Sequence, residues 1–285
     1  MRFQYHTKIK LHMLSYYLTI CAKVHSKNPD KFTYFETHAG DGLVTLPDDS
    51  TTEGSAVIAA SSKLKFPCVL TERLYHEELE KNLRSELGEI DHVTILPVDC
   101  NERIDEILRH VKAHYHSLGF VDPSHPGELK WSTIESIGSH EHKYQTGDIR
   151  RPEMLLNFPI GRIKRNAGWL DKTVEGQQQM NRRQTAIKHN DDFFGTTEWQ
   201  EVWRKSEDLT EFFLGRLMGL GYTACLHTQV DEIQNHVPIY VLMLLISQHK
   251  AEEVLPGLAK GLERWQREDY VREYYKVHDL AKWVK

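Results

Sequence analysis

Short and long apolar segments alternate along the first 160 residues of the chain. The short runs are rich in β-branched and aromatic residues, which is typical of buried strands; they cover 32–36, 68–72, 93–99, 116–122 and 154–159. The longer stretches carry apolar residues at helical spacing, over 7–26, 56–65, 73–88 and 102–114. Because parallel strands need long crossover connections, this alternation predicts a parallel sheet joined by helices.

The stretch over 7–26 predicts a helix that packs through one face. The apolar positions of that face are Ile9, Met13, Tyr16, Tyr17, Ile20 and Val24. Asn28-Pro29-Asp30 is expected to end the helix. Residues 43–53 read as a polar loop, and Ser55 is placed to cap the helix that follows.

The pattern changes after the fifth strand. A helical region runs from Trp199 to Gly221, and two apolar runs at 223–230 and 239–246 are joined by a polar turn, which predicts an antiparallel pair. We therefore expect an α/β fold with a mostly parallel seven-stranded sheet and an antiparallel terminal pair. The predicted domain covers 1–250, with an insertion at about 160–222 and a helical extension over 251–285.

Composition excludes several classes of protein. The 285 residues are 40% hydrophobic with a net charge of −5, which is typical of a globular chain without an overall basic coat. No run approaches the roughly 20 apolar residues of a membrane span, and the N-terminus lacks the apolar region of a signal peptide. The four scattered cysteines read as buried, reduced thiols. We expect a cytoplasmic protein.

The first strand leads into the segment that organises the rest. Glu36 ends the strand, and Gly40-Asp41-Gly42 follows as a tight turn. Glycine has no side chain and tolerates positive φ, so such a turn lets backbone N–H groups approach a ligand closely. Alone, this signal is weak, since Gly-containing turns without a ligand are common.

Polar residues end the later strands as well. They are Glu72, Asp99 with Asn101, Asp122-Pro123 and Asn157. In open parallel sheets the carboxyl ends of the strands line one ligand crevice. Glu72 is a candidate for ribose binding and otherwise belongs to the start of the next helix. Asp99 is placed to accept a hydrogen bond from an exocyclic amine, and Asn101 is placed to cap helix 102–114.

Residues 161–190 form a basic segment. They hold seven Lys and Arg residues against two acids, a local excess of +5, so the rest of the chain carries −10. The cations are Arg162, Lys164, Arg165, Lys172, Arg182, Arg183 and Lys188. An insertion that faces an anion and a solvated, partly disordered loop both fit this pattern.

The order of these features resembles the three-Cys-motif partner proteins (TcmP), a family with the Rossmann-like fold of class I methyltransferases. The match runs from about Lys8 to His249. Its segments are Ala39-Gly40-Asp41-Gly42, Gly54-Ser55, Glu72, Asp99-Cys100-Asn101, Phe120-Val121-Asp122-Pro123, Leu129-Lys130-Trp131, Leu156-Asn157-Phe158-Pro159, Pro238-Ile239-Tyr240 and Ser247-Gln248-His249. The Thr37-His38-Ala39-Gly40 segment also looks like the first motif of a bacterial large-subunit ribosomal RNA adenine-N6 methyltransferase.

The resemblance implies an S-adenosylmethionine site. Its cofactor-binding residues would be Glu36, His38, Gly40, Gly42, Glu72, Asp99 and Asn101. Of these, Glu36 and the two glycines would surround the methionine part, Glu72 would bind the ribose hydroxyls and Asp99 would read the adenine amine. Asp41 departs from the proline common in related sequences, and it puts a second carboxylate near that of the cofactor.

The resemblance also implies an acceptor site of Asp122, Pro123 and Asn157, where amino-methyltransferases carry Asp/Asn-Pro-Pro-Tyr/Phe. The carboxylate and a backbone carbonyl would hold the target amine, and the aromatic residue stacks on a flipped base. Here Ser124-His125 replaces Pro-Tyr/Phe, so the rigidity of the second proline and the better stacking ring are both missing. Cofactor binding is therefore better supported than base methylation.

Two functions remain open at this point. One is a methyltransferase acting on a base of a nucleic acid, which it engages through Arg162, Lys164, Arg165, Arg182 and Arg183. The other is a non-catalytic, methyltransferase-like partner of a protein encoded nearby, in a defence or mobile-element operon. An acceptor pocket would need Asp122 and Asn157 open to solvent.

Two other readings are weaker. His114-x-His116 and His140-x-His142 would suit a metal, but no acidic ligand set accompanies them, so we expect none. A dinucleotide oxidoreductase has no G-x-G-x-x-G turn here to support it.

Overall fold

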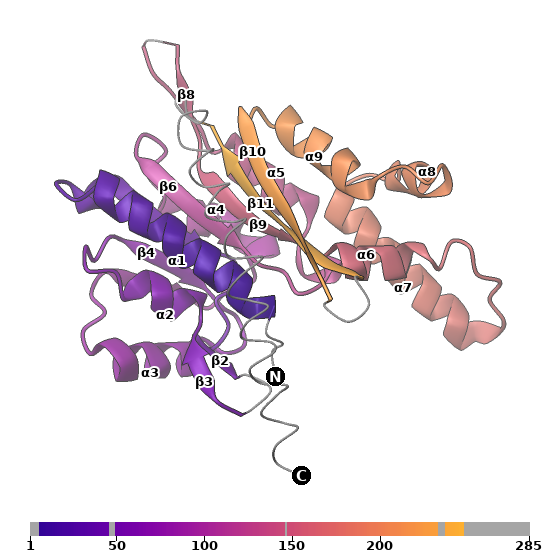
Figure 1. The fold of residues 1–285 in the computed structure, drawn as a ribbon, viewed down its shortest axis with the longest axis horizontal. Coiled ribbons are helices and arrows are strands. Elements are labelled where there is room, and N and C mark those ends of the chain that lie inside the picture. Colours follow the sequence, from indigo (N-terminus) through magenta and orange to yellow (C-terminus); the bar gives the residue numbers. More distant parts are fainter. Residues whose placement is uncertain (1–5, 46–48, 146, 233–236, 248–285) are drawn as a thin grey trace. The chain divides into compact units, whose positions relative to one another are not determined.

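The computed structural model describes residues 6–45, 49–145, 147–232 and 237–247. This part of the chain forms two compact units that divide between Val98 and Asp99. Figure 1 shows the elements of both. The N-terminal five residues and the predicted extension over 251–285 lie outside the described residues.

The first unit is built on three parallel strands in the order β1-β4-β5. They are β1 (Phe32–Glu36), β4 (Cys68–Thr71) and β5 (Val93–Leu96). Every residue of β1 and β4 is buried, as expected for strands of a parallel sheet that is covered on both faces. The remaining elements are α1 (His6–Val24), η1 (Pro29–Lys31), β2 (Leu43–Thr45), β3 (Thr51–Glu53), α2 (Ser55–Ala60) and α3 (His76–Leu87).

The structure confirms the predicted packing face of α1 in part: Ile9, Met13 and Tyr17 are buried, whereas two other predicted positions are not. Tyr16 and Val24 are 41% and 70% exposed. The buried positions include Leu11, Leu14, Leu18 and Cys21, whose spacing of three and four residues makes a continuous apolar stripe. The buried face of α1 therefore combines Ile9, Met13 and Tyr17 with this stripe, and the prediction missed the stripe.

Two further expectations in this unit were wrong. The predicted polar loop over 43–53 contains the antiparallel pair β2 and β3. Helix α3 begins at His76, so Leu74 lies before it and is 67% exposed. The predicted end of α3 at Gly88 is confirmed, since this glycine has φ +73°.

The second unit orders its strands β10-β11-β9-β6. Strands β6 (His116–Val121) and β9 (Glu153–Phe158) are parallel, while β11 (Pro238–Ile246) runs antiparallel to β9 and to β10 (Ala224–Asp231). The other elements are α4 (Cys100–Arg109), η2 (Pro126–Glu128), α5 (Trp131–Ser139), β7 (His142–Lys143), β8 (Ile149–Arg150), α6 (Ile160–Ala167), α7 (Gly176–Phe194), α8 (Trp199–Arg204) and α9 (Leu209–Gly219).

An aromatic cluster joins the last helices of this unit to β9. Phe158 stacks on Phe213 with ring centroids 4.6 Å apart, and Phe193, Phe194 and Trp199 pack around them. All five side chains are fully buried. The cluster anchors the second half of α7 and the helix α9, so the basic segment over 161–190 is held in two helices and is not a disordered loop.

The seven strands confirm the predicted fold class. Neighbouring strands are parallel in three pairs, and the strand pair nearest the described C-terminal end is antiparallel. This is an α/β, Rossmann-like architecture with a mostly parallel seven-stranded sheet. Within the described ranges, no helix combines the length and the apolar character needed to cross a membrane.

The cysteines are free thiols, as predicted. Cys21, Cys68 and Cys100 are buried and Cys225 is half-buried. Burial raises the pKa of the Cys100 and Cys225 thiols to about 12, because an apolar environment disfavours the thiolate. These thiols are therefore small packing groups and not nucleophiles.

Gly221→Ala tests the packing of the second unit. Gly221 has φ +90°, and an added Cβ would lie 2.0 Å from Arg151 Nη1. We expect the free energy of unfolding to fall by about 2–4 kcal/mol from backbone strain and overpacking. Gly215→Ala is the control, because the new Cβ in α9 would meet no atom within 4 Å. This control should raise the free energy of unfolding by up to about 1 kcal/mol, since alanine favours the helix over glycine. Urea unfolding measures both; equal stabilities would contradict this packing.

Candidate functional site

The carboxylate of Glu36 lies fully buried at the end of β1. Its Oε2 accepts a hydrogen bond from the Tyr34 hydroxyl at 2.9 Å, and its Oε1 accepts one from Ser55 Oγ at 2.5 Å. Ser55 is the first residue of α2, so it does not cap that helix as predicted; Gly54 occupies the cap position. Glu36 therefore ties β1 to the start of α2, and its predicted contact with a cofactor stays a prediction.

The glycine turn after β1 packs directly against the segment before α2. Gly54 N donates to Gly42 O at 2.8 Å, and a Cβ on Gly54 would lie 2.7 Å from that oxygen. Gly42 has φ +83° and Gly40 has φ +61°. A Cβ at Gly40 would meet no atom within 4 Å, so the turn has open space on that side, which is what the close approach of a ligand requires.

Glu72 holds this turn from the end of β4. Its Oε2 accepts the N–H of Gly40 at 3.0 Å, and its Oε1 accepts those of Leu74 and Tyr75 at 2.8 and 3.2 Å. A carboxylate offers about four acceptor positions, so capacity for a ribose hydroxyl remains beside these three bonds. The residues of this turn therefore fit S-adenosylmethionine, the cofactor that the sequence resemblance implies.

The two other residues of the turn differ in exposure. His38 is half-buried, with its Nδ1 2.7 Å from Thr37 Oγ1. Asp41 is exposed, and its carboxylate accepts the N–H of Leu43 within its own turn at 3.1 Å.

Asp99 and Asn101 begin α4 in the second unit. Asp99 caps this helix, accepting the N–H of Asn101 at 2.8 Å, so the prediction that Asn101 is the cap was wrong. The Asn101 amide donates to Glu128 O at 2.8 Å and accepts from Lys130 N and Thr133 Oγ1 at 2.8 and 2.9 Å. Asn101 thus clamps the segment before α5 onto α4, and the cofactor roles of both residues stay predictions.

The turn at residues 122–128, which we call the acceptor turn, follows β6. Asn157 on β9 donates from Nδ2 to Pro123 O at 3.0 Å. Its side chain is buried, and its Oδ1 has no hydrogen-bond partner among the residues that the structure describes. Asp122 is half-buried. Asn157 is therefore not exposed to solvent, as a direct contact with the acceptor would require. It holds the Pro123 carbonyl in place through its hydrogen bond.

Glu128 closes the acceptor turn on itself. Its carboxylate accepts Ser124 N at 2.6 Å and Ser124 Oγ at 2.9 Å, and lies 3.3 Å from His125 Nε2. His125 Nδ1 accepts the N–H of Gly127 at 3.1 Å. These bonds supply the rigidity that the missing second proline would give. The sequence signal was an acid four residues after the serine, which strand and helix patterns do not reveal.

Helix α7 packs against the acceptor turn through His189. The His125 and His189 rings are stacked with centroids 5.8 Å apart, and a Cβ on Gly127 would lie 2.8 Å from the His189 ring. The pKa of His189 is lowered, and burial of the ring is the largest cause. The nearby His125 and Lys188 also lower this pKa, while Asp192 raises it.

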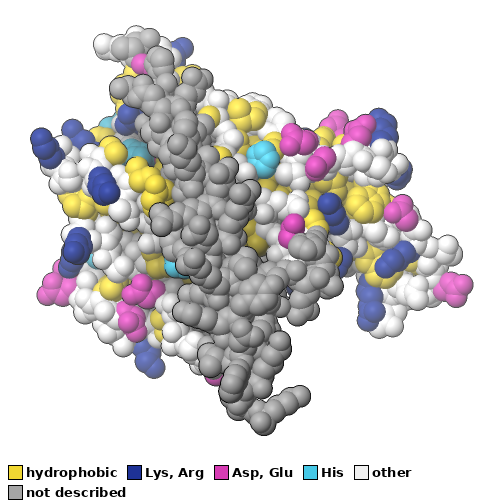
Figure 2. Space-filling model, viewed as in Figure 1, with side chains coloured by type: hydrophobic (Ala, Val, Ile, Leu, Met, Phe, Trp, Pro, Cys, Tyr) yellow, Lys and Arg dark blue, Asp and Glu magenta, His cyan; other side chains and the backbone are white. Residues whose placement is uncertain are grey.

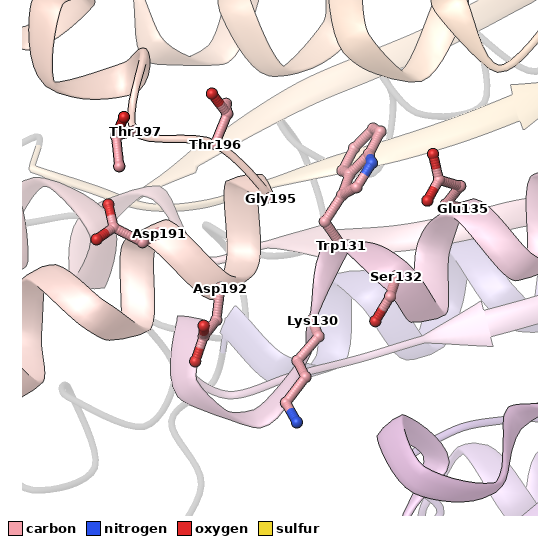
Figure 3. Close-up of a pocket in the computed structure, with 9 residues that line it drawn as sticks. All are labelled: Lys130, Trp131, Ser132, Glu135, Asp191, Asp192, Gly195, Thr196 and Thr197. Carbon is pink, nitrogen blue, oxygen red and sulfur yellow. The ribbon is translucent and has the colours of Figure 1, made fainter.

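An open pocket of about 440 Å³ lies between the start of α5 and the end of α7. Figure 3 shows its lining side chains, from Lys130 to Glu135 on one side and from Asp191 to Thr197 on the other. Three of them are acids and one is a lysine, so the pocket does not suit an anion. Asp191 accepts Trp199 Nε1 at 2.8 Å, and Asp192 pairs with Lys188 at 2.5 Å.

One histidine of each His-x-His pair has a polar partner inside the protein. His116 Nε2 lies 2.7 Å from Glu153 Oε2 in a buried pair, and His140 Nε2 lies 2.6 Å from Val111 O. Across the described ranges, no three His, Cys, Asp or Glu side chains gather closely enough to hold a metal ion.

The comparisons with known proteins show a likeness of fold. Neither a protein-family model nor a curated protein matches the sequence. Among solved structures, the chain resembles protein LPL1258 from Legionella pneumophila str. Philadelphia 1, of family-model DUF519, with 13% identity and a TM-score of 0.52 over 92% of this chain and 93% of that one.

Two methyltransferase structures also match. They are precorrin-6y C5,15-methyltransferase from Geobacter metallireducens GS-15 (11% identity, TM-score 0.36, 85% and 86% of the chains) and the methyltransferase domain of bacterial CtHen1-CN (12%, 0.39, 84% and 100%). These TM-scores are too low to carry an argument about the site.

Ser55→Ala tests the buried Glu36 network. Removing the hydroxyl leaves a carboxylate oxygen inside the protein without this donor, and we expect a loss of about 1–3 kcal/mol in the free energy of unfolding. Ser61→Ala, just after the same helix, removes an exposed hydroxyl and should change stability by less than about 0.5 kcal/mol. Urea unfolding compares the two variants; a neutral Ser55→Ala would contradict the network.

The His189 environment predicts a pH dependence. Its folded pKa lies below the usual 6.5, so the unfolded chain binds the proton more tightly. Stability should therefore fall as the pH drops below 6.5 through the folded pKa. His189→Phe keeps a ring beside Gly127 without a titrating group, so the fall between pH 7.5 and 5.5 should be smaller. The exposed His227→Phe is the control, and an equal fall in both variants would refute this role.

Proposed function

We propose that the protein is an S-adenosylmethionine-dependent methyltransferase that acts on an amino group of a base in nucleic acid, and that it belongs to the three-Cys-motif partner family. The observation that carries this proposal is the acceptor turn, in which Asn157 holds the Pro123 carbonyl in place next to Asp122. Amino-methyltransferases use this pair of acceptors on the target amine.

The cofactor part of the proposal rests on the first unit. Gly40 and Gly42 provide a turn that a ligand can approach, and Glu72 orders that turn while keeping acceptor capacity for ribose hydroxyls. When bound, S-adenosylmethionine supplies an electrophilic methyl group on its sulfonium. Asp41 supports the fit because its carboxylate is exposed and already accepts a bond from its own turn.

The acceptor part rests on the second unit. The Asp122 carboxylate and the Pro123 carbonyl would accept the two N–H bonds of an exocyclic amine, which fixes the amine and directs its lone pair. A carbonyl oxygen has two lone pairs, so Pro123 O can keep its bond to Asn157 while it binds the amine. His125 offers a ring beside this position, held by Glu128 and His189.

The nucleic-acid part rests on five cations of α6 and α7, namely Arg162, Lys164, Arg165, Arg182 and Arg183. Within the described ranges none of them forms an ion pair with a carboxylate. Burial lowers the pKa of Arg165, and the neighbouring charge of Arg162 lowers it further, as expected for cations gathered without an anion. Figure 2 shows Lys and Arg side chains over these helices. A nucleic acid, with its negatively charged backbone, would be a complementary partner for this group of cations.

One observation favours the second candidate, a non-catalytic protein with the same fold. Asn157 is buried, Glu128 bonds to Ser124 within the acceptor turn, and Asp122 is only half-buried, so the acceptor residues are not all open to solvent. Such a scaffold, a partner of a protein encoded nearby, would not need to bind the cofactor. Cofactor binding therefore separates the two candidates.

Calorimetric titration with S-adenosylmethionine tests the proposal. The wild-type protein should bind, and Glu72→Ala should weaken binding at least about tenfold, because both the ribose acceptor and the order of the Gly40 turn are lost. Glu80→Ala is the control, since it removes an exposed glutamate of α3.

Asp99→Ser separates a ligand role from a structural one. Serine keeps the cap of α4 but cannot reach as far as aspartate, so weaker binding at unchanged melting temperature would assign Asp99 to the cofactor. No heat and no thermal shift of the wild-type protein at millimolar cofactor would overturn the methyltransferase proposal and leave the scaffold.

A further inference from the structure

The first half of α7, residues 176–185, is an exposed polar helix. Nine of its ten residues are exposed and Arg183 is half-buried, whereas the second half buries Ala186, Asn190, Phe193 and Phe194. Figure 1 shows this start of α7 reaching away from β9 and β11 of its own unit. Ten helical residues span about 15 Å. We call this segment the outer half of α7.

The composition of the outer half argues against docking on another protein. Met180 is its only large apolar residue, so there is no apolar stripe to lie in a groove. It has no acidic residue. Most of its other side chains are amides and guanidinium groups: Gln177, Gln178, Gln179, Asn181, Arg182, Arg183 and Gln184. A helix that is polar on all sides has no apolar face to bury, so a molecule that binds this segment must offer it polar groups.

These residue types match the edges of bases in a duplex. Arginine makes two hydrogen bonds to guanine, and asparagine or glutamine makes two to adenine, in the major groove of B-form DNA. Gln178 and Arg182 lie four residues apart and so share a face of the helix. Within the described ranges neither side chain makes a hydrogen bond, while Gln177 and Gln179 are already bonded to Asn181 and to the N–H of Glu175.

The neighbouring helix α6 carries a group of cations. Asn190 of α7 bonds to Asn166 and to the Ile163 carbonyl of α6, which fixes the two helices against each other. Helix α6 carries Arg162, Lys164 and Arg165 without an acidic residue. Cations that bind phosphates position a protein on a duplex, and side chains in the groove then read the sequence.

We propose that the outer half of α7 enters the major groove of duplex DNA and reads base edges through Gln178 and Arg182, while the α6 cations bind the flanking phosphates. This inference rests on the proposed function in taking nucleic acid as the target. An α-helix fits the major groove of B-form DNA, about 12 Å wide, but the major groove of A-form RNA is too narrow for side chains to read.

Selection from random-sequence pools tests the inference without any methyl transfer. The full chain is incubated with a duplex DNA pool and, in parallel, with a duplex RNA pool, and the bound fractions are sequenced. We expect an enriched DNA motif and no enriched motif in the RNA. Gln178→Ala and Arg182→Ala should each lose base preference at one or two positions and bind the enriched duplex about tenfold more weakly.

Two control variants distinguish recognition of the bases from electrostatic binding to phosphates. Arg109→Ala removes an exposed cation from α4 and should keep the motif. Arg162→Ala should weaken binding to all sequences equally and reduce the slope of log affinity against log salt by about 1.

The outcomes distinguish this inference from the proposed function. Three results would overturn the role of the outer half of α7 while nucleic acid remains the target. They are a motif that is unchanged in both α7 variants, the absence of an enriched DNA motif, and preferred binding of RNA. Failure to bind any pool at low salt would overturn the nucleic-acid part of the proposed function as well.

Discussion

A buried carboxylate organises the first unit. Glu36 has no exposed surface, yet it ends a strand of apolar and aromatic residues. Removing a charge from water is costly unless hydrogen bonds compensate, and the hydroxyls of Tyr34 and Ser55 donate to it. The bond to Ser55 sets where α2 begins, and the preceding Gly54 then locks Gly42 by a backbone bond. The shape of the glycine turn thus depends on a charge that itself lies inside.

In the second unit, polar side chains hold the loops at the ends of the strands in place. Asn101 clamps the segment before α5, Asn157 holds Pro123, and Glu128 bonds the turn between them. Loops at the ends of strands carry unsatisfied backbone groups, and these three side chains satisfy them. These bonds hold the acceptor turn where the motif of amino-methyltransferases has a second proline, so the departure in its sequence does not remove the rigidity that the proline provides.

The sequence predicted the seven strands of the main sheet and the fold class, but not the pair β2 and β3 or the polar contacts. Apolar runs such as those of β1 and β11 have one stable use, a buried strand, so periodicity finds them. Ser55 and Asn101 were both assigned as helix caps because their residue types favour that position; the neighbours Gly54 and Asp99 took it instead, since the side chains of Ser55 and Asn101 bond across 19 and 27–32 residues. Contacts over such separations are set by the fold and leave no local pattern. Asn157 was placed among the acceptor residues, yet burial on β9 makes it a support.

The measurement that tests the central claim most directly is transfer of a labelled methyl group from S-adenosylmethionine to duplex DNA. We expect label in an amino group of a base, transfer lost in Asp122→Ala, and cofactor affinity retained in that variant, because Asp122 acts on the acceptor. Two results would contradict the account. One is cofactor binding without label in duplex DNA, single strands or RNA, and the other is equal labelling by Asp122→Ala and the wild-type protein.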